Sequence, residues 1–247
     1  MTISRIIELG EPGPDFDAVY RDMLAPNFPA HELEPAEVIA EGIAAGTTSV
    51  LVALAEDGHR LGTAIGEWDA DHRVQLLTYL AVDGRRRAGG VGGRLLDAAR
   101  QRWVARYRPL VLLAEVEHPA TEAGEAAWGD PRRRFDFYVR RGARVLDLPY
   151  FQPALGEGAQ RGYGMLLITL YLDDEFREPG ADRVPSAPVR GFLEDYLREC
   201  EGEVADDAAT TALLAACADD RGIGLLDPAA TPVERLPRST PNAAGLS

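Results

Sequence analysis

The chain has 247 residues and a formal net charge of -14, with 26 basic and 40 acidic side chains. A content of 46% hydrophobic and 27% charged residues is typical of a folded globular protein and argues against disorder. The acidic balance argues against a nucleic-acid partner, because affinity for a phosphate backbone needs a broad basic face.

The first third of the chain predicts a strand, two helices and then three antiparallel strands. Asp15 is expected to cap the first helix, whose apolar residues recur at helical spacing, and a proline-rich break follows it. Asp57-Gly58 joins two apolar runs in the manner of a β-hairpin. The expected elements are strand 3–9, helix 16–24, helix 36–46, strands 48–57 and 58–68, and strand 73–82.

The remainder alternates helices and strands before becoming acidic and helical. A helix with an apolar stripe from Leu96 to Tyr107 should end at Pro109, and Asp130 with Pro131 should begin another that stops at Gly142. The other expected elements are strand 110–117, strands 143–155 and 163–172, helices 189–200 and 207–220, and a loose tail over 228–247. The order predicts a mixed α/β protein rather than a regular βαβ alternation.

Several classes of protein and site are not expected from this sequence. No apolar run reaches the roughly 20 residues of a membrane span, and the first residues lack the order of a signal peptide, so we expect a cytoplasmic protein with no membrane partner. Cys200 and Cys217 are predicted to be free thiols. The four histidines are scattered and no Cys/His spacing fits a metal site, so no metal is expected.

The stretch "DGRRRAGGVGGRLL" (83–96) is the most informative part of the chain. Between Gly84 and Pro109 there are eight arginines and one acid, Asp97, which points to a compact anion site. A P-loop is excluded because the chain has no lysine, and a dinucleotide fingerprint fails because Leu95 stands where its third glycine belongs. The pattern R-x-x-G-x-G fits residues 87–92. Its glycines would let backbone amides at a helix N-terminus approach a diphosphate.

With these residues in view, the chain resembles the GNAT superfamily of acyl-CoA-dependent N-acyltransferases. The resemblance covers residues 3–172 and rests on "LAVDGRRRAGGVGGRLL" and the later "FDFYVRRGARVL". Gly84 stands where the family commonly has proline, and Ala88 where it has glycine. The positions in register with the family pattern L-x-V-x-P-x-x-R-G-x-G-[IV]-G-x-x-L-[LI] are Leu80, Val82, Arg87, Gly90, Val91, Gly92, Leu95 and Leu96.

The resemblance implies a fold and a domain organisation. The fold would be a GNAT-like α/β fold, with a central, mostly antiparallel, twisted sheet covered by helices on both faces. Residues 1–172 would form the acyltransferase domain. Residues 173–247 would form an acidic C-terminal helical extension and a loose tail, packed on the same domain.

The resemblance also implies acetyl-CoA as co-substrate and a cofactor-binding segment around the glycine loop. The backbone N–H of Val82 would polarise the thioester carbonyl, and the amides of residues 87–92 would hold the pyrophosphate. The charge argument adds Arg85, Arg86 and Arg94 as partners of the phosphates. The expected cofactor-binding residues are Leu80, Ala81, Val82, Arg85, Arg86, Arg87, Ala88, Gly89, Gly90, Val91, Gly92, Gly93 and Arg94.

Four residues are candidates for proton transfer. Tyr138 aligns with the tyrosine that many family members use to protonate the coenzyme A sulfur; the alternative is a core aromatic. Glu115 and Glu117 alternate on one face at the end of a strand and could act as the general base, or they could be rim charges that attract a cationic substrate. His118 is a further candidate base.

The expected substrate contacts are Gln75 and Tyr79 on the central strand, and Phe28, His31 and Glu32 in a loop that often covers the acceptor in this family. The predicted function is an N-acetyltransferase that acts on a small-molecule amine or an amino terminus by direct attack in a ternary complex. The alternatives are a non-catalytic acyl-CoA sensor, or an interaction protein that uses the C-terminal helices. The sequence leaves open whether the chain forms a homodimer.

Overall fold

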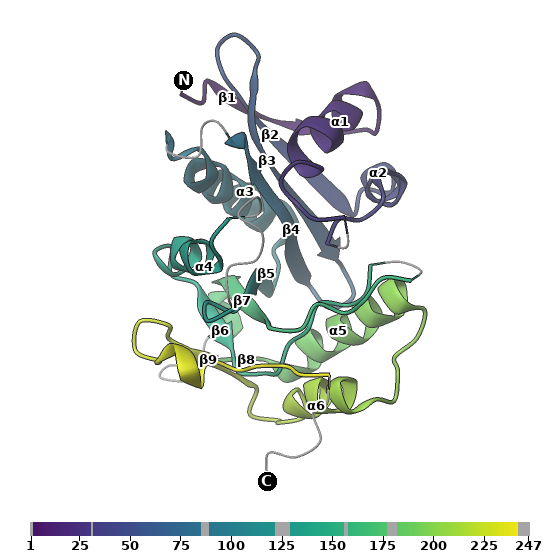
Figure 1. The fold of residues 1–247 in the computed structure, drawn as a ribbon, viewed down its shortest axis with the longest axis vertical. Coiled ribbons are helices and arrows are strands. Elements are labelled where there is room, and N and C mark those ends of the chain that lie inside the picture. The colour runs from purple at the N-terminus through teal and green to yellow at the C-terminus, as the bar shows by residue number, and fades with distance from the viewer. Residues whose placement is uncertain are drawn as a thin grey trace. The chain divides into compact units, whose positions relative to one another are not determined.

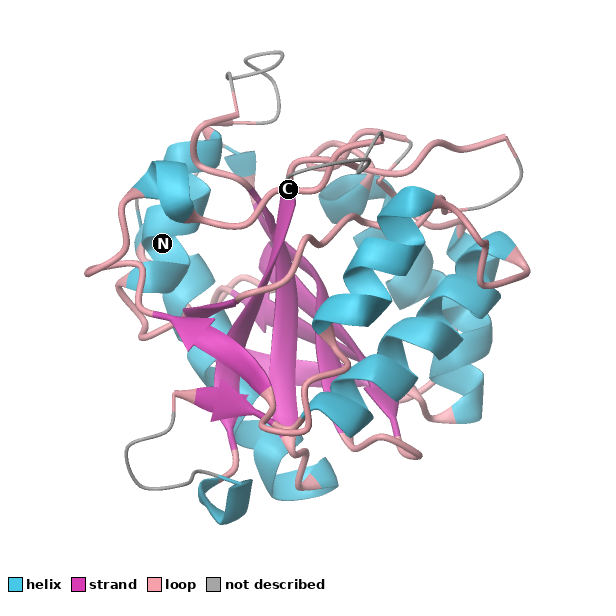
Figure 2. Cartoon of the chain, turned by 90° about the horizontal axis from the view of Figure 1, so that it is seen from below, coloured by secondary structure: helices cyan, strands magenta, loops and turns pink. Residues whose placement is uncertain are grey.

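The structure is a computed structural model that describes residues 2–30, 32–84, 89–121, 129–155, 158–176 and 182–241. The chain divides into two compact units, Met1–Asp69 with Gln75–Arg108 and Ala70–Val74 with Pro109–Ser247. Helices and strands are interspersed along the chain, which confirms the mixed α/β class (Figure 2). Among the described helices, none combines the length and the apolar character needed to span a membrane.

In the first unit the strands follow one another in chain order, β1-β2-β3-β4, with β1–β2 and β2–β3 antiparallel. The sequence predicted these four strands, one before the two helices and three after them. The bounds are β1 (Arg5–Leu9), α1 (Pro14–Val19), the π-helical turn η1 (Tyr20–Leu24), α2 (Ala36–Ala45), β2 (Thr48–Leu54), β3 (Arg60–Asp69), β4 (Val74–Val82) and α3 (Val91–Tyr107).

The helices of the first unit cover both faces of these strands (Figure 1). On one face an apolar cluster joins α1, η1 and α2 to the sheet, including Phe16, Leu24, Ile39 and Ile65. On the other face lies α3, whose Trp103 is buried and donates from Nε1 to Ser49 Oγ of β2 at 2.9 Å. Because both faces are covered, every residue of β2 is buried.

The ends of the helices test the predicted caps. Asp15 is not the N-cap of α1, because the helix begins one residue earlier at Pro14, after Gly13. The carboxylate of Asp15 accepts from Arg60 Nη2 at 2.8 Å instead. Asp130 is confirmed as the N-cap of the helix that follows it, since its side chain accepts from the amides of Arg132 and Arg133.

In the second unit the strand order is β5-β7-β6-β9-β8, and all the recorded pairings are antiparallel. The bounds are β5 (Val111–Glu117), α4 (Pro131–Val139), β6 (Arg144–Leu146), β7 (Met165–Leu172), the 3-10 turn η3 (Asp174–Phe176), β8 (Arg183–Val184), α5 (Ser186–Glu201), α6 (Ala208–Ala216), β9 (Ile223–Leu226) and the 3-10 turn η4 (Val233–Arg235).

The prediction of one long strand over 143–155 is wrong, because the strand found there is much shorter. Only Arg144–Leu146 is a strand, and Gln152 forms an isolated bridge with Gly162. Pro149 and Pro153 interrupt the run, and proline cannot donate to a β-ladder. The short strands β8 and β9, which the sequence did not indicate, complete the sheet, because β9 pairs with β6.

The C-terminal part of the chain is tied to the rest of the second unit. Arg161 donates to Glu201 of α5 and to Asp207, the N-cap of α6, and its side chain is only 13% exposed. Ser239 is buried, and its hydroxyl donates to the carbonyl of Tyr150. Cys200 and Cys217 are free thiols, as predicted. The predicted domain boundary at residue 172 stays a prediction.

Candidate active site

The glycine-rich loop connects β4 to α3 in the first unit. Val82, the last residue of β4, is half-buried, and Gly84, Gly89 and Gly90 are exposed. The predicted cofactor residues Arg85, Arg86, Arg87 and Ala88 lie outside the described residues. Gly90 has φ 68° and ψ 9°, a left-handed conformation that strongly favours glycine, and it caps the N-terminus of α3.

The first turn of α3 presents amides ahead of the first helical hydrogen bond. That bond runs from Arg94 N to Gly90 O at 3.2 Å, so the amides of Val91, Gly92 and Gly93 come before it. The macrodipole of a helix of 17 residues adds about half a positive charge at this end. The N-terminus of α3 therefore has the donors and the potential that suit an anion.

Two glycines of β3 bring α3 close to the sheet. A Cβ atom on Gly62 would lie 2.7 Å from the carbonyl oxygen of Ala81 and 3.4 Å from the side chains of Val91 and Leu95. A Cβ atom on Gly66 would lie 2.6 Å from the ring of Trp103. Since neither space is available, β3 needs glycine at both positions, and the direction in which α3 starts is set by this close packing.

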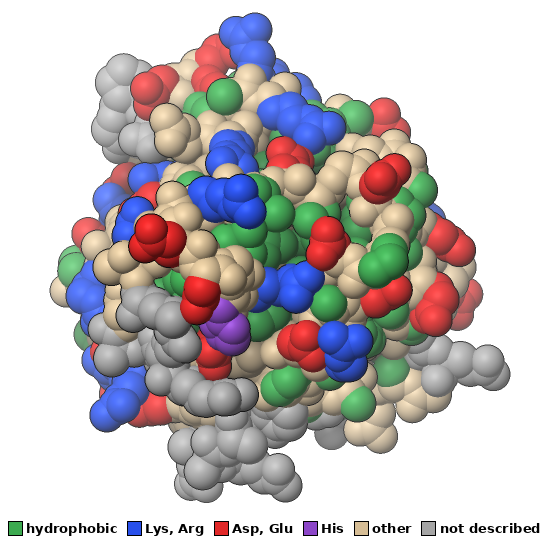
Figure 3. All heavy atoms as spheres, turned by 90° about the horizontal axis from the view of Figure 1, so that it is seen from above, with side chains coloured by type: hydrophobic (Ala, Val, Ile, Leu, Met, Phe, Trp, Pro, Cys, Tyr) green, Lys and Arg blue, Asp and Glu red, His purple; other side chains and the backbone are tan. Residues whose placement is uncertain are grey.

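The arginines of α3 divide into two groups. Arg102 donates to the carbonyl of Ile6 at 2.7 Å, and Arg106 pairs with Glu8 at 2.9 Å, so both tie α3 to β1. Arg94 is exposed and makes no ion pair with any described residue. The face drawn in Figure 3 shows arginine and acidic side chains intermixed. Part of the local arginine excess is therefore structural.

Three of the predicted substrate contacts lie together in the first unit. The buried hydroxyl of Tyr79 accepts from the amide of Glu34 at 2.9 Å and donates to the carbonyl of Glu32 at 3.3 Å. The ring of Phe28 packs edge-on against the ring of Tyr79, with centroids 5.0 Å apart. Tyr79 thus anchors the segment that carries Glu32. His31 lies outside the described residues.

Gln75, the other predicted contact on β4, lies on the opposite face of the sheet from Tyr79. Its Nε2 atom would be 2.7 Å from a Cβ atom on Gly66, beside Trp103 of α3, whereas Tyr79 belongs to the cluster under α1 and α2. Residues four apart in a regular strand share a face, so β4 is irregular between these two residues. Because Gln75 and Tyr79 point to opposite faces of the sheet, they do not line one pocket together.

In the second unit, Glu115 is held at the end of β5 by two side chains. The hydroxyl of Tyr150 donates a hydrogen bond to Oε1 of Glu115, and Gln152 Nε2 donates to Oε2 at 3.3 Å. The sequence did not indicate Tyr150 or Gln152, because the run that contains them was interpreted as a strand. The Tyr-x-Gln spacing was the available signal, since alternate residues of an extended segment point to the same side.

Glu117 and Tyr138 are linked through helix α4. Glu117 forms an ion pair with Arg134 of α4. Tyr138 lies one turn further along, and residues four apart share a helix face, so Tyr138 is on the face that meets β5. Burial raises the pKa of Tyr138 to about 12, against the opposing effect of Arg134 and Arg141. The phenol is therefore protonated at neutral pH.

His118 is buried directly after β5. Its Nδ1 atom accepts from the amide of Ala120 at 3.1 Å. Burial, together with the charge of Arg238, lowers its pKa, so the ring is neutral at pH 7. Because Nδ1 is occupied by this turn, His118 serves the local backbone and is less suited than Glu115 to act as a base.

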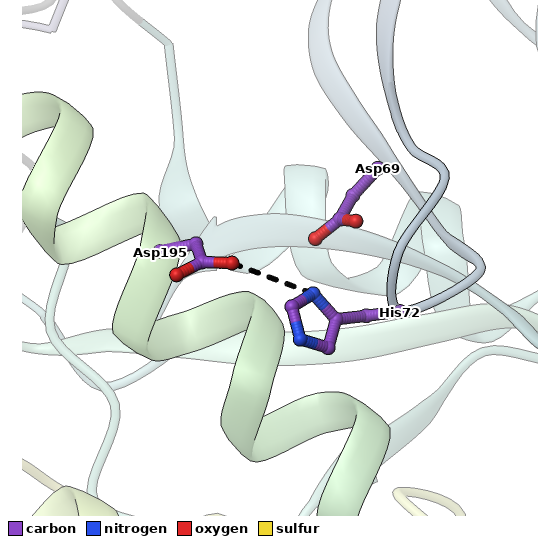
Figure 4. A group of neighbouring side chains, drawn as sticks. All are labelled: Asp69, His72 and Asp195. Carbon is purple, nitrogen blue, oxygen red and sulfur yellow. Dashed lines mark ion pairs between the residues drawn. The ribbon is translucent and has the colours of Figure 1, made fainter.

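A histidine and a carboxylate also meet in the second unit, away from β5. His72 Nδ1 lies 3.7 Å from Asp195 Oδ2 of α5, and the two side chains point toward one another (Figure 4). Asp195 also pairs with Arg198 at 2.5 Å. A carboxylate that already has a guanidinium partner is a poor start for a cation site, so we assign this pair to packing of the turn on α5.

Comparison with known proteins shows what fold this is. No protein-family model matches the sequence, and no curated protein matches it. A proposed GNAT-family acetyltransferase from Bacteroides thetaiotaomicron is 24% identical, with a TM-score of 0.51 over 69% of this chain and 89% of that one. A proposed acetyltransferase from Acinetobacter baylyi ADP1 is 14% identical, with a TM-score of 0.50 over 71% and 96% of the two chains.

The chain therefore has the fold of the GNAT acetyltransferases. This confirms the fold that the resemblance implied.

Proposed function

We propose that this protein is a GNAT acyltransferase that transfers an acetyl group from acetyl-CoA to an amine by direct attack in a ternary complex. The observation that carries the proposal is the glycine loop at the end of β4, which opens into the N-terminus of α3 within a GNAT fold. Cofactor binding is assigned to the glycine loop and the start of α3, and proton transfer to Glu115 and Tyr138. No metal is part of the proposal.

The cofactor would be bound chiefly by main-chain amides. In this proposal the Val82 amide polarises the thioester carbonyl, and the amides at the start of α3 hold the pyrophosphate, where the helix dipole adds to their effect. Arg94 and the loop arginines 85–87 would neutralise phosphate charge. Glycine at position 90 allows the left-handed turn that this arrangement needs.

Proton transfer would use Glu115 and Tyr138. An amine arrives as an ammonium ion, so Glu115 takes its first proton and frees the lone pair that attacks the thioester carbonyl. The sulfur departs as a thiolate, and the second proton that the nitrogen loses as the amide forms passes to it to give the thiol. A phenol with a pKa of about 12 is a weaker acid than a thiol with a pKa of about 8.5, so Tyr138 would stabilise the thiolate chiefly as a hydrogen-bond donor.

The acceptor is proposed to be a cationic amine on a small molecule or an amino terminus. The net charge of -14 favours the approach of a cation over that of an anion. Release of coenzyme A should be measured against amines, amino acids, aminoglycosides and peptides. Binding of acetyl-CoA without release in any of these classes would support the sensor alternative instead.

The cofactor site can be tested by calorimetry. We expect the double variant Gly90→Val, Gly92→Val to bind acetyl-CoA at least about tenfold more weakly, because a β-branched residue is strained at φ 68° and would displace the amides. Gly202→Val is the matched control: Gly202 ends α5 with φ 83°, so the strain is similar. Equal affinity in the double variant and the control would remove the cofactor assignment.

A further inference from the structure

Each of the two carboxylate oxygens of Glu115 accepts a hydrogen bond from the segment that follows β6. The Tyr150 hydroxyl binds Oε1, and the Gln152 amide binds Oε2 at 3.3 Å. Glu115 itself is half-buried, and Tyr150 is 1% exposed. Two donors on different oxygens fix both the place and the rotation of a carboxylate, which a single donor does not do.

The backbone that carries these two donors is itself anchored. Gln152 exchanges a pair of hydrogen bonds with Gly162, both at 2.9 Å. The carbonyl of Tyr150 accepts from the hydroxyl of Ser239, and that hydroxyl in turn accepts from the amide of Gly164 at 3.4 Å. The backbone of both donor residues is therefore fixed by hydrogen bonds. This distinguishes them from mobile surface side chains that contact a carboxylate.

Such a cluster is a poor way to gain stability alone. Burying a phenol and a carboxylate costs desolvation energy, and apolar residues of similar volume are often as good or better. Tyr150 also stays a donor at every physiological pH, because burial, and then the nearby Glu115, raise its pKa well above 10. Its proton is thus permanently available to the carboxylate.

We propose that Tyr150 and Gln152 are positioning residues that hold the carboxylate of Glu115 in the orientation in which it takes the proton from the acceptor ammonium. This inference rests on the proposed function, since it assigns these residues to the same proton transfer. Neither residue touches the reacting atoms in this scheme. Both act through Glu115.

Other ionisable groups lie around the cluster and bear on its titration. Glu117 is on the same face of β5 and is paired with Arg134 of α4, so its charge is partly neutralised. Cys200 of α5 lies near enough to Tyr150 to raise the pKa of that phenol. Since these groups are unchanged in a Tyr150→Phe variant, a change in the titration of Glu115 can be attributed to the lost hydroxyl.

The first test does not depend on activity. The carboxyl of Glu115 would be followed by carbon-13 NMR over pH in the full chain with labelled glutamate, and the signal assigned with Glu115→Gln. A hydrogen bond to the charged form lowers a carboxyl pKa, so Tyr150→Phe should raise the pKa of Glu115 by about one unit. Tyr163→Phe is the control, because Tyr163 lies in the same connection between β6 and β7 and its ring packs against that of Phe151. An unchanged pKa in Tyr150→Phe would overturn the inference.

The second test uses the acyl transfer itself. Tyr150→Phe should lower kcat about tenfold and move the acidic limb of the pH profile upward, while Tyr163→Phe should do neither. In the Glu115→Gln background the added effect of Tyr150→Phe should vanish, because the group it positions is gone. Additive effects would contradict positioning. If Tyr150→Phe does not fold, Gln152→Ala, at a half-buried position, takes its place in both tests.

The two proposals fail in different ways. An unmodified chain that transfers no acyl group to any acceptor class refutes the proposed function and leaves the NMR titration to decide on the positioning. If Tyr150→Phe raises the pKa of Glu115 as expected but its effect on kcat adds to that of Glu115→Gln, the carboxylate is positioned but not used in catalysis.

Discussion

At the scale of single residues, burial favours the neutral forms of three polar groups near the end of β5. It lowers the pKa of His118 and raises those of Tyr138 and Tyr150, so all three are neutral at pH 7. With two neutral phenols and a neutral imidazole, the carboxylates of Glu115 and Glu117 are the groups of this region that can accept a proton at pH 7, and the guanidinium of Arg134 pairs with Glu117.

Tyr138→Phe tests the role of the second phenol. We expect kcat to fall about 10- to 100-fold, because the hydrogen bond to the leaving sulfur is lost, while the Kd of acetyl-CoA stays unchanged. Since the pKa of Tyr138 is about 12, its protonated form persists as pH rises through 10, and the unmodified chain should show no alkaline loss of kcat from this group below pH 11. Steady-state kinetics over pH, with calorimetry for acetyl-CoA, measure both.

Tyr107→Phe is the control for that variant. Tyr107 lies at the end of α3, stacked on Trp68, and its hydroxyl is buried without a hydrogen-bond partner among the described residues. Its loss should leave kcat unchanged. Full turnover in Tyr138→Phe would assign Tyr138 to packing alone.

At the scale of elements, close approach depends on glycine in the middle of regular structure. Gly191 lies inside α5, where a Cβ atom would be 2.1 Å from Nε2 of His72. The His72 ring therefore packs against α5 at Gly191, where the absence of a side chain leaves space for it. The same logic applies to Gly62 and Gly66 under α3.

Gly191→Ala tests this contact through the sign of its effect. Helix propensity alone predicts that alanine stabilises by about 1 kcal/mol, whereas displacement of the His72 ring should destabilise by about 1–3 kcal/mol. We expect net destabilisation in the unmodified chain and net stabilisation in a His72→Ala background. Urea denaturation of the four chains of this cycle measures both signs. Stabilisation by Gly191→Ala in the presence of His72 would show that the ring does not occupy this place.

At the scale of the whole molecule, the residues beyond 172 are part of the second unit. The strand β9 pairs with β6 through Val145↔Leu226 and Leu146↔Leu225. Helix α5 contributes buried side chains such as Phe192 and Leu193. Arg161 adds ion pairs to Glu201 and Asp207 with little exposure of the guanidinium.

Truncation after Leu172 should therefore prevent the second unit from folding. It would leave β6 without its partner β9 and remove the apolar face of α5, so we expect an insoluble chain. A chain ending at Pro241 keeps every described element and should fold normally. Solubility and circular dichroism distinguish the two. A soluble, folded chain of 172 residues would instead make the C-terminal part a separate module.

Much of this arrangement could be predicted from local patterns. The cap at Asp130, the left-handed Gly46 that ends α2, and the glycine loop before α3 were all predicted from residues within one or two turns of each other. Gly142 is also left-handed, but α4 ends before it, at Val139. Such features depend on backbone geometry over a few residues, and the neighbouring side chains determine that geometry. The fold class followed from their order.

Contacts between distant segments were decided only by the tertiary structure. Tyr150 and Glu115 are 35 residues apart, and no spacing rule says which donor a buried carboxylate will meet. Asp15 could have accepted hydrogen bonds from the first amides of a helix or from Arg60. It accepts from Arg60 because β3, which carries that arginine, lies close to it. The strands β8 and β9 are too short to show a period in the sequence; β9 forms by pairing with β6, and β8 by pairing with β9. Sequence alone therefore determined most of the helices and strands and the place of the glycine loop, because these are local. The choice of partners needed the fold, because it depends on which segments meet.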